Sequence, residues 1–365
     1  MKIFFLILPL VFFISGQALS EVKVVTSIKP IHSLVANIMK GSTYPKLIVD
    51  SSGTPHHYNL KPSQVKAIQN ADLIIWVSNT LEGFLKKPIE VNAKKAKKFE
   101  ILESDKIKRL KIREKIYITR VEDTHHDEHH DEHKDEHKDE HHDEHHDEHK
   151  DAHHDEHHDE HKDAHHDEHK DAHHDEHKDA HHDEHHHDHS NMIYDPHIWL
   201  DTGNAKIIVK IIAEILANID PENENLYRAN ELDTVERIKN LESEIQILLE
   251  PVKDSKFIAT HDAYYYIENQ FNIDSLYHIV NAPEDLMSAS TIRNAIKLLE
   301  TNPGICLFTE PGFDNARMSS TLNKNINEIA TLDPSGSLIA SGPDHYFEFM
   351  TGNARTLNEC LKNSK

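Results

Sequence analysis

Residues 224–250 decide the fold, because their sequence, ENLYRANELDTVERIKNLESEIQILLE, predicts one long amphipathic helix. The apolar stripe of this helix consists of Leu226, Ala229, Leu232, Val235, Ile238, Leu241, Ile245 and Leu248. A second helical pattern, 202–218, lies just before it, and the strand-like run 256–260 follows it. The long helix therefore separates the chain into two halves.

Strand and helix patterns alternate in both halves. Before the long helix, strands are predicted at 21–26, 46–50, 73–77 and 99–102, and helices at 30–39, 62–70 and 202–218. After it, strands are predicted at 256–260, 275–280, 305–308 and 328–332, and helices at 263–270, 288–300, 314–325 and 346–361. Such alternation is typical of parallel sheets covered by helices. We expect an α/β fold with two lobes, each containing a parallel sheet flanked by helices, joined by a long rigid helix beside a cleft.

Residues 1–20 have the pattern of a secretory signal peptide, with a basic Lys2, an apolar core and a small-residue end. We therefore expect a protein exported to a bacterial periplasm. The expected parts of the mature chain are an N-terminal lobe over 21–121 and 191–221, a loop over 122–190, an interlobe helix over 222–252 and a C-terminal lobe over 253–365.

The segment 125–189 consists almost entirely of His, Asp, Glu and Lys, repeated with a period of four, and holds 28 of the 35 histidines. Residues 122–189 carry 29 acidic side chains and 6 lysines, so nearly all of the net charge of −24 belongs to them. A segment this poor in apolar residues is expected to be disordered without a ligand. Its histidines favour metal binding over a charged solubilising spacer. The nearly neutral remainder offers no basic footprint for a nucleic acid.

The chain contains two cysteines, Cys306 and Cys360. An even number in an exported protein favours a disulfide, because that compartment is oxidising. Two buried free thiols are the alternative. A metal site built on this pair is disfavoured, because neither residue has a second cysteine nearby in the sequence.

Three other histidines and one aspartate lie where predicted strands end or helices begin. His56 follows the second strand of the first half, and His197 lies just before the helix that precedes the long one. His261 directly follows the first strand of the second half, and Asp333 follows the last strand. Ligands of open α/β sheets bind outside the carboxyl ends of the strands. Together these side chains would form a tetrahedral His₃Asp site in the cleft, a ligand set that zinc accepts.

Each of these residues alone has an ordinary structural explanation, as a hydrogen-bonded histidine or a turn-capping aspartate. His57 could replace or join His56. Glu310, which also ends a strand, either orients a ligating imidazole or is an acid in a surface turn. No ligand role is predicted for the remaining histidines, His32, His278 and His345.

Seven stretches are similar to one family of metal receptors: SIKPIHSLVA (27–36), HHYNLKPS (56–63), ADLIIWV (71–77), DPHIWL (195–200), THDAY (260–264), TEPGF (309–313) and TLDPSG (331–336). Through them the chain resembles the periplasmic zinc-binding proteins of bacterial zinc ABC importers. The resemblance covers essentially the whole mature chain, and the His-rich segment stands where zinc members carry a His-rich loop.

This resemblance implies four metal-ligand positions, His56, His197, His261 and Asp333, with water in place of the aspartate in some members. It also implies a disulfide in the second lobe that matches Cys306 and Cys360. Manganese members place a carboxylate where this chain has His261, so the nitrogen donor favours zinc. Pro55 stands where some zinc members have an acidic residue that can approach the metal.

The resemblance implies a monomer, not an enzyme, that captures Zn²⁺ in the cleft and delivers it to a membrane permease and its ATPase. The His-rich loop would serve as a low-affinity zinc collector. The alternatives are a manganese or iron receptor, a periplasmic metal buffer without a transport role, and a zinc hydrolase, which needs an open coordination position and a general base.

Overall fold

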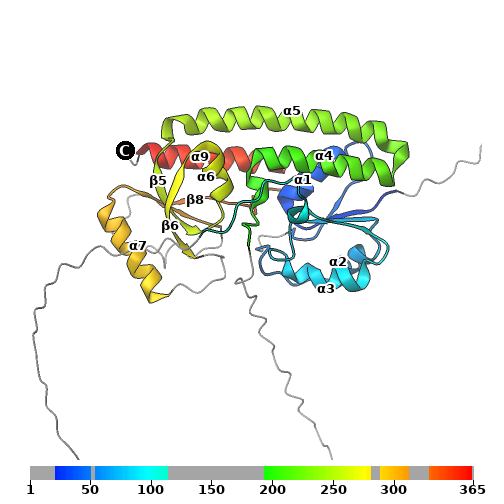
Figure 1. Cartoon of the computed structure of the whole chain (residues 1–365), viewed down its shortest axis with the longest axis horizontal. Helices are drawn as coiled ribbons and strands as arrows, with labels where there is room; N and C mark the ends of the chain where they lie inside the picture. The colour runs from blue at the N-terminus through cyan, green and yellow to red at the C-terminus, as the bar shows by residue number, and fades with distance from the viewer. Residues whose placement is uncertain (1–20, 51–53, 114–192, 281–287, 312–328, 364–365) are drawn as a thin grey trace, which may run out of the picture. The chain divides into compact units, whose positions relative to one another are not determined.

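The computed structural model describes residues 21–50, 54–113, 193–280, 288–311 and 329–363. The described strands form two four-stranded sheets with the orders β2-β1-β3-β4 and β6-β5-β7-β8, and every neighbouring pair is parallel. Helices flank both sheets (Figure 1). The predicted fold class is confirmed. The predicted signal peptide, 1–20, and the predicted His-rich loop, 122–190, lie outside the described residues.

The first sheet contains β1 (Val24–Thr26), β2 (Lys46–Leu47), β3 (Leu73–Trp76) and β4 (Lys97–Glu100). Its helices are α1 (Lys29–Ile38), α2 (Pro62–Gln69), α3 (Gly83–Asn92) and α4 (Thr202–Ile219). Every residue of β1 and β3 is buried, and all but Thr26 are apolar, as expected where both faces of a parallel sheet are covered. Helix α3 is not predicted by the sequence patterns, because Pro88 lies inside it and proline removes a helical hydrogen bond.

The second sheet contains β5 (Lys256–His261), β6 (Asp274–Val280), β7 (Cys306–Thr309) and β8 (Ile329–Thr331). Its helices are α6 (Tyr265–Phe271), α7 (Ala289–Thr301) and α9 (His345–Asn363). The helix predicted at 314–325 lies outside the described residues. Helix α7 packs against one face of this sheet through a small apolar cluster that is separate from the main core. The cluster contains Leu298 and Leu299 of the helix and Ile258 and Leu307 of the strands.

Cys306 and Cys360 form a disulfide with a Cα–Cα distance of 6.0 Å, as predicted. Cys306 begins β7 and Cys360 lies in α9, so the bond ties the closing helix to the middle of the second sheet. The two residues are 54 positions apart. Closing a loop of that length stabilises the fold by about 4 kcal/mol in the chain-entropy model.

Helix α5 (Glu224–Leu249) joins the lobes. It packs against α1 and α4 of the first lobe and α9 of the second, and Figure 1 shows it running along these helices. Its buried residues are Tyr227, Thr234, Val235, Ile238, Leu241, Ile245 and Leu249. The predicted apolar stripe is therefore only partly right, and Leu232 is 71% exposed. Residues three apart rotate by about 60° per step around a helix, so a stripe built on threes leaves the buried face.

The main apolar core is continuous from the first sheet through α5 to α9. Both lobes thus share one packed interior to which α5 contributes. None of the described helices combines the length and the apolar character needed to cross a membrane.

Candidate metal site

Three buried histidines from distant parts of the chain meet in one cluster. The ring centroids of His56 and His197 lie 5.7 Å apart, those of His56 and His261 5.4 Å, and those of His197 and His261 5.0 Å. Each ring offers one nitrogen within 4.8 Å of the other two. Nitrogens that share one tetrahedral zinc lie about 3.4 Å apart. A small inward movement would therefore place all three on a single ion.

His261 is the last residue of β5, and Glu310 directly follows β7, the neighbouring strand. The chain runs from β5 to β6 on one side and returns to β7 on the other, so the strand order reverses between β5 and β7. Such a reversal leaves an open crevice at the carboxyl ends of the strands. The fold of the second lobe therefore brings His261 and Glu310 together at this crevice.

His197 is held by the residues on both sides of it. Its backbone N–H and its ring Nδ1–H both donate to Oδ1 of Asp195, at 2.8 Å each. Asp201 then caps α4 by accepting hydrogen bonds from the backbone N–H groups of Gly203 and Asn204. The position of His197 is thus fixed relative to the start of a long buried helix.

His56 lies in the turn that connects β2 to α2, and its backbone N–H donates to Oγ1 of Thr54 at 3.2 Å. The buried side chain of Gln64, at the start of α2, braces this turn. It donates to the carbonyl of Ile48 at 2.6 Å and to the hydroxyl of Tyr58 at 3.0 Å. The His56 side chain is only 5% exposed.

Two carboxylates orient two of the three imidazoles. Oε1 of Glu310 accepts a hydrogen bond from Nδ1 of His261 at 2.8 Å, in the same way that Asp195 accepts one from His197. Nε2 of His261 is buried and has no hydrogen-bond partner within the described part of the chain. A carboxylate on Nδ1 fixes the tautomer that presents Nε2 as a metal ligand and increases its basicity. Burial disfavours the protonated ring, but the Glu310 carboxylate, together with the charges of Asp262 and Asp195, outweighs burial and raises the pKa of His261.

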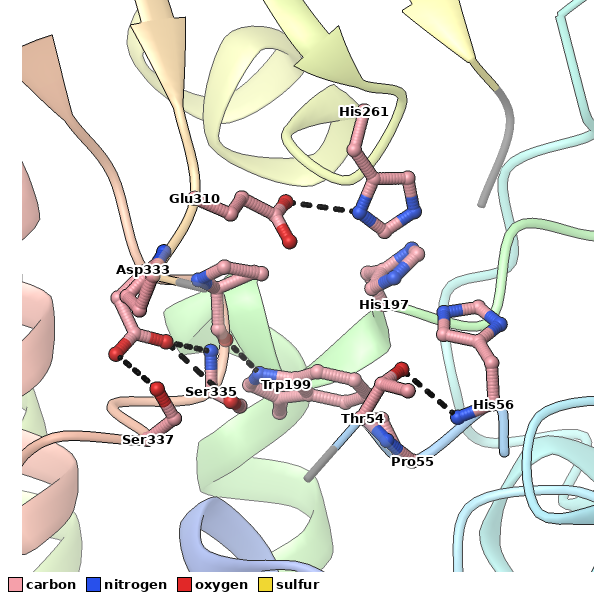
Figure 2. Close-up of a pocket in the computed structure, with 12 residues that line it drawn as sticks. Thr54, Pro55, His56, His197, Trp199, His261, Glu310, Asp333, Ser335 and Ser337 are labelled. Carbon is pink, nitrogen blue, oxygen red and sulfur yellow. Dashed lines mark hydrogen bonds and ion pairs between the residues drawn. The ribbon is translucent and has the colours of Figure 1, made fainter. Parts of the chain in front are cut away.

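Asp333 lines the same pocket but is not part of the histidine cluster. Its Oδ1 accepts from the backbone N–H of Ser335 at 3.1 Å, and its Oδ2 accepts from the hydroxyl of Ser337 at 2.9 Å. Figure 2 shows this carboxylate turned toward the two serines and away from the three imidazoles. The structure therefore brings together three of the four predicted ligands and leaves the Asp333 carboxylate in its own turn.

The other histidines lie elsewhere. His57 is exposed and does not line the pocket, and His32 contacts the carbonyl of Pro45 through Nε2. His345, at the start of α9, contacts the carbonyls of Ser335 and Ala340. His278, on β6, lies among the charged side chains of Arg113, Asp262 and Glu268.

The histidines open onto a pocket of about 60 Å³ between the lobes, which has room for an ion and a few water molecules. Trp199 forms part of its wall: its indole N–H donates to the carbonyl of Pro334 at 2.7 Å, and its ring lies 5.4 Å from that of His197. The roles of Trp199 and Asp195 were not predicted from the sequence. The Asp-X-His spacing of residues 195–197 is the signal that could have identified Asp195, since an aspartate two residues before a ligand can reach its ring.

Comparisons with known proteins agree with this architecture. A family model described as "Zinc-uptake complex component A periplasmic" matches residues 24–360. The chain is 36% identical over 338 residues to a high-affinity zinc uptake system protein ZnuA of Brucella abortus, covering 93% of this chain and 91% of that protein. It is 33% identical over 348 residues to the protein of the same description from Haemophilus influenzae, covering 95% of each.

Solved structures share the fold. A crystal structure of ZnuA superposes with a TM-score of 0.64 at 17% identity, covering 94% of this chain and all of that one. A zinc-bound AdcAII variant of Streptococcus pneumoniae gives 0.62 at 20% identity, covering 93% and 98%. A manganese-bound periplasmic metal-binding protein of Candidatus Liberibacter asiaticus gives 0.61 at 18% identity, covering 93% and 99%.

Two parallel-sheet lobes, a long joining helix and a three-histidine cluster between the lobes define a substrate-binding protein of the metal-receptor type. Within that class, the chain belongs to the family of periplasmic zinc-uptake complex component A proteins, the zinc-binding components of zinc ABC importers. The resemblance predicted from the sequence motifs is confirmed.

Proposed function

We propose that this protein captures Zn²⁺ in the bacterial periplasm with His56, His197 and His261, and delivers it as a monomer to the permease and ATPase of a zinc ABC importer. The observation that carries the proposal is the cluster of three buried imidazoles contributed by both lobes. Because the ligands come from both lobes, a bound ion would link the two lobes directly. The relatives named as high-affinity zinc uptake proteins support the same function.

Zinc is the proposed cargo because all three donors are imidazole nitrogens, which suit zinc better than manganese. The fold alone does not choose the metal, since structures of this fold are described as bound to zinc, manganese and cadmium. The choice of metal therefore depends on the donor atoms of the ligands, and the nitrogen of His261 is the one that distinguishes zinc from manganese. This histidine occupies the position at which the resemblance to manganese receptors predicts a carboxylate.

A water molecule is the proposed fourth ligand, because the Asp333 carboxylate is engaged by Ser335 and Ser337. Asp333 would replace that water only by leaving both serines. A water-bound zinc resembles a hydrolytic site, but both carboxylates that line the pocket are engaged. Glu310 accepts from His261, and Asp333 accepts from Ser335 and Ser337, so neither is free to act as a general base. We therefore propose a transport protein and not an enzyme.

The His-rich segment 125–189 is proposed to collect zinc at low affinity and to raise its local concentration. Its deletion is then expected to preserve one tight site. Such a deletion is feasible because Ile112 and Ile193, which lie on either side of the segment, are neighbours: the backbone N–H of Ile112 donates to the carbonyl of Ile193 at 3.1 Å. The residues left between them can therefore serve as a short linker.

A zinc titration of the protein lacking residues 125–189 tests the proposal, with Trp199 as the fluorescent reporter beside His197. We expect one tight site that prefers Zn²⁺ to Mn²⁺ in competition, and its loss in His197→Ala and His261→Ala. If the shortened protein bound no zinc tightly, or preferred Mn²⁺, the cleft would not be a zinc-capture site. A control variant, His57→Ala, changes an exposed histidine next to the cluster and should bind as the parent does.

A further inference from the structure

The residues that flank the segment 114–192 form a short antiparallel stem, which comprises residues 110–113 and 193–195. Lys111 pairs with Tyr194, and the backbone N–H of Asp195 donates to the carbonyl of Leu110 at 2.9 Å. Asp195 is also the residue that holds His197. The stem is therefore continuous with one of the three metal-site histidines.

The stem lies against α6 of the other lobe. The hydroxyl of Tyr266, in α6, accepts from the backbone N–H of Leu110 at 3.1 Å and donates to the carbonyl of Asp195 at 3.0 Å. Tyr266 is fully buried. Because α6 begins four residues after His261, this contact brings the stem close to the strand end that carries the second histidine.

Arg113, in the stem, reaches farther into the second lobe. Nη1 donates to Oε2 of Glu268 at 2.6 Å, and Nη2 donates to Oε1 of the same carboxylate at 3.2 Å. Nη2 also donates to Oδ1 of Asp262, the residue next to His261. The guanidinium lies over the ring of Tyr265, 4.3 Å from its centroid. One side chain thus binds both the end of β5 and the middle of α6.

This group of charges is buried and paired. The side chain of Arg113 is 15% exposed and that of Glu268 is 3% exposed. Burial alone would raise the pKa of Glu268, but hydrogen bonds from His278 and Arg113 and their charges lower it to about 2. A planar guanidinium that binds a carboxylate with both Nη atoms is directional, so it fixes position as well as charge.

We propose that Arg113 is a positioning residue of the zinc site, which holds the His261 end of β5 at a set distance from the stem that carries Asp195 and His197. The inference rests on the proposed capture of zinc by these histidines. Arg113 touches no ligating ring, and it acts through Asp262 and Glu268. Without it, His261 and His197 would approach the ion from less well-fixed positions.

The test measures zinc binding at the cleft of the full-length protein. Trp76→Phe in every variant leaves Trp199, on the pocket wall, as the single tryptophan, so zinc bound elsewhere does not change the signal. Zinc affinity is measured by chelator competition and zinc release by mixing with excess chelator. Arg113→Gln is expected to weaken zinc binding by about tenfold or more, the range for groups that orient metal ligands, mainly through faster release. Arg113→Lys is expected to restore part of the loss, because an ammonium keeps the charge but not the paired geometry.

Arg237→Gln is the matched control. Arg237 also pairs with a carboxylate, that of Asp344, at 2.7 Å and also lies over an aromatic ring, that of Phe347, at 4.0 Å. It contacts no residue adjacent to His56, His197 or His261. We expect its loss to change thermal stability and to leave zinc affinity and release at the parent values.

The outcomes separate the two proposals. If the parent gives no zinc-dependent Trp199 signal, the proposed function fails before Arg113 is considered. If the parent binds zinc and Arg113→Gln matches it in affinity and release while only its melting temperature falls, Arg113 is structural and the inference is wrong. Should Arg113→Gln fail to fold, Asp262→Asn removes the ionic contact beside His261 and retains Glu268. Unchanged zinc release in that variant would equally overturn the inference.

Discussion

His261 and Glu310 share a hydrogen bond of 2.8 Å between Nδ1 and Oε1, although 49 residues separate them in the sequence. The bond exists because β5 and β7 are neighbours and both side chains lie at the carboxyl ends of these strands. Asp195 accepts an equivalent hydrogen bond from Nδ1 of His197, although these two residues are only two positions apart in the sequence. Both rings therefore present Nε2 to the pocket before any ion arrives.

Removing the Glu310 carboxylate should weaken zinc binding. We expect Glu310→Ala to reduce zinc affinity by about 10- to 100-fold and Glu310→Gln by less, because the amide can still accept from His261 but carries no charge. Chelator competition measures the effect. Glu250→Gln, which changes an exposed glutamate on the surface, is the control. Unchanged affinity in Glu310→Ala would show that this contact has no part in the site.

Asp333→Asn should have little effect on zinc affinity. The carboxylate is bound by Ser335 and Ser337, so we expect a change within a factor of about three, against more than about a hundredfold for His197→Ala. Isothermal titration of the two variants makes the comparison. A loss in Asp333→Asn as large as that in His197→Ala would mean that Asp333 leaves its turn and binds the ion.

Loss of the disulfide should lower stability and leave the site intact. Cys306→Ser with Cys360→Ser is expected to lower the free energy of unfolding by about 4 kcal/mol, since the bond closes a long loop. Urea unfolding followed by circular dichroism measures this change. Zinc affinity should stay near the parent value, because neither cysteine lines the pocket. A large loss of affinity with unchanged stability would contradict this account.

Acid should weaken the metal-free fold through Glu268. Its pKa is lowered to about 2 in the folded state, from an ordinary value of 4.5. The carboxylate therefore contributes stability that is complete above pH 4.5 and is lost as the pH falls toward 2. The contribution is about 3 kcal/mol. Urea unfolding at pH 5 and pH 3 should give a large stability difference between the parent and Glu268→Gln at pH 5 and a smaller one at pH 3. A difference that does not depend on pH would exclude this linkage.

The arrangement of the three histidines could be predicted from the sequence because it depends on chain topology. A residue at the end of a buried strand, such as His261, lies at the carboxyl edge of its sheet whatever its side chain does. The alternation of strands and helices determines that topology, and apolar periodicity reveals it. Chain topology likewise explains why Glu310 lies beside His261. It does not reveal whether Glu310 orients the imidazole or is an acid in a surface turn.

The position of the Asp333 carboxylate could not be predicted in this way. Its backbone lies at a strand end as expected, but its side chain accepts hydrogen bonds from the backbone N–H and hydroxyl of Ser335 and from the hydroxyl of Ser337. Local capture of an aspartate by its own turn competes with metal binding, and sequence spacing does not decide between them. Arg113 was missed for a related reason, since its contacts are made to another lobe and no local pattern marks them.

The most direct test of the central claim is a crystal structure of the zinc-loaded protein with anomalous scattering measured at the zinc absorption edge. The account predicts one strong peak in the cleft, about 2.0–2.1 Å from a ring nitrogen of His56 and from Nε2 of His197 and His261. A fully occupied protein whose zinc peak lies away from these three rings, or touches only one of them, would contradict it.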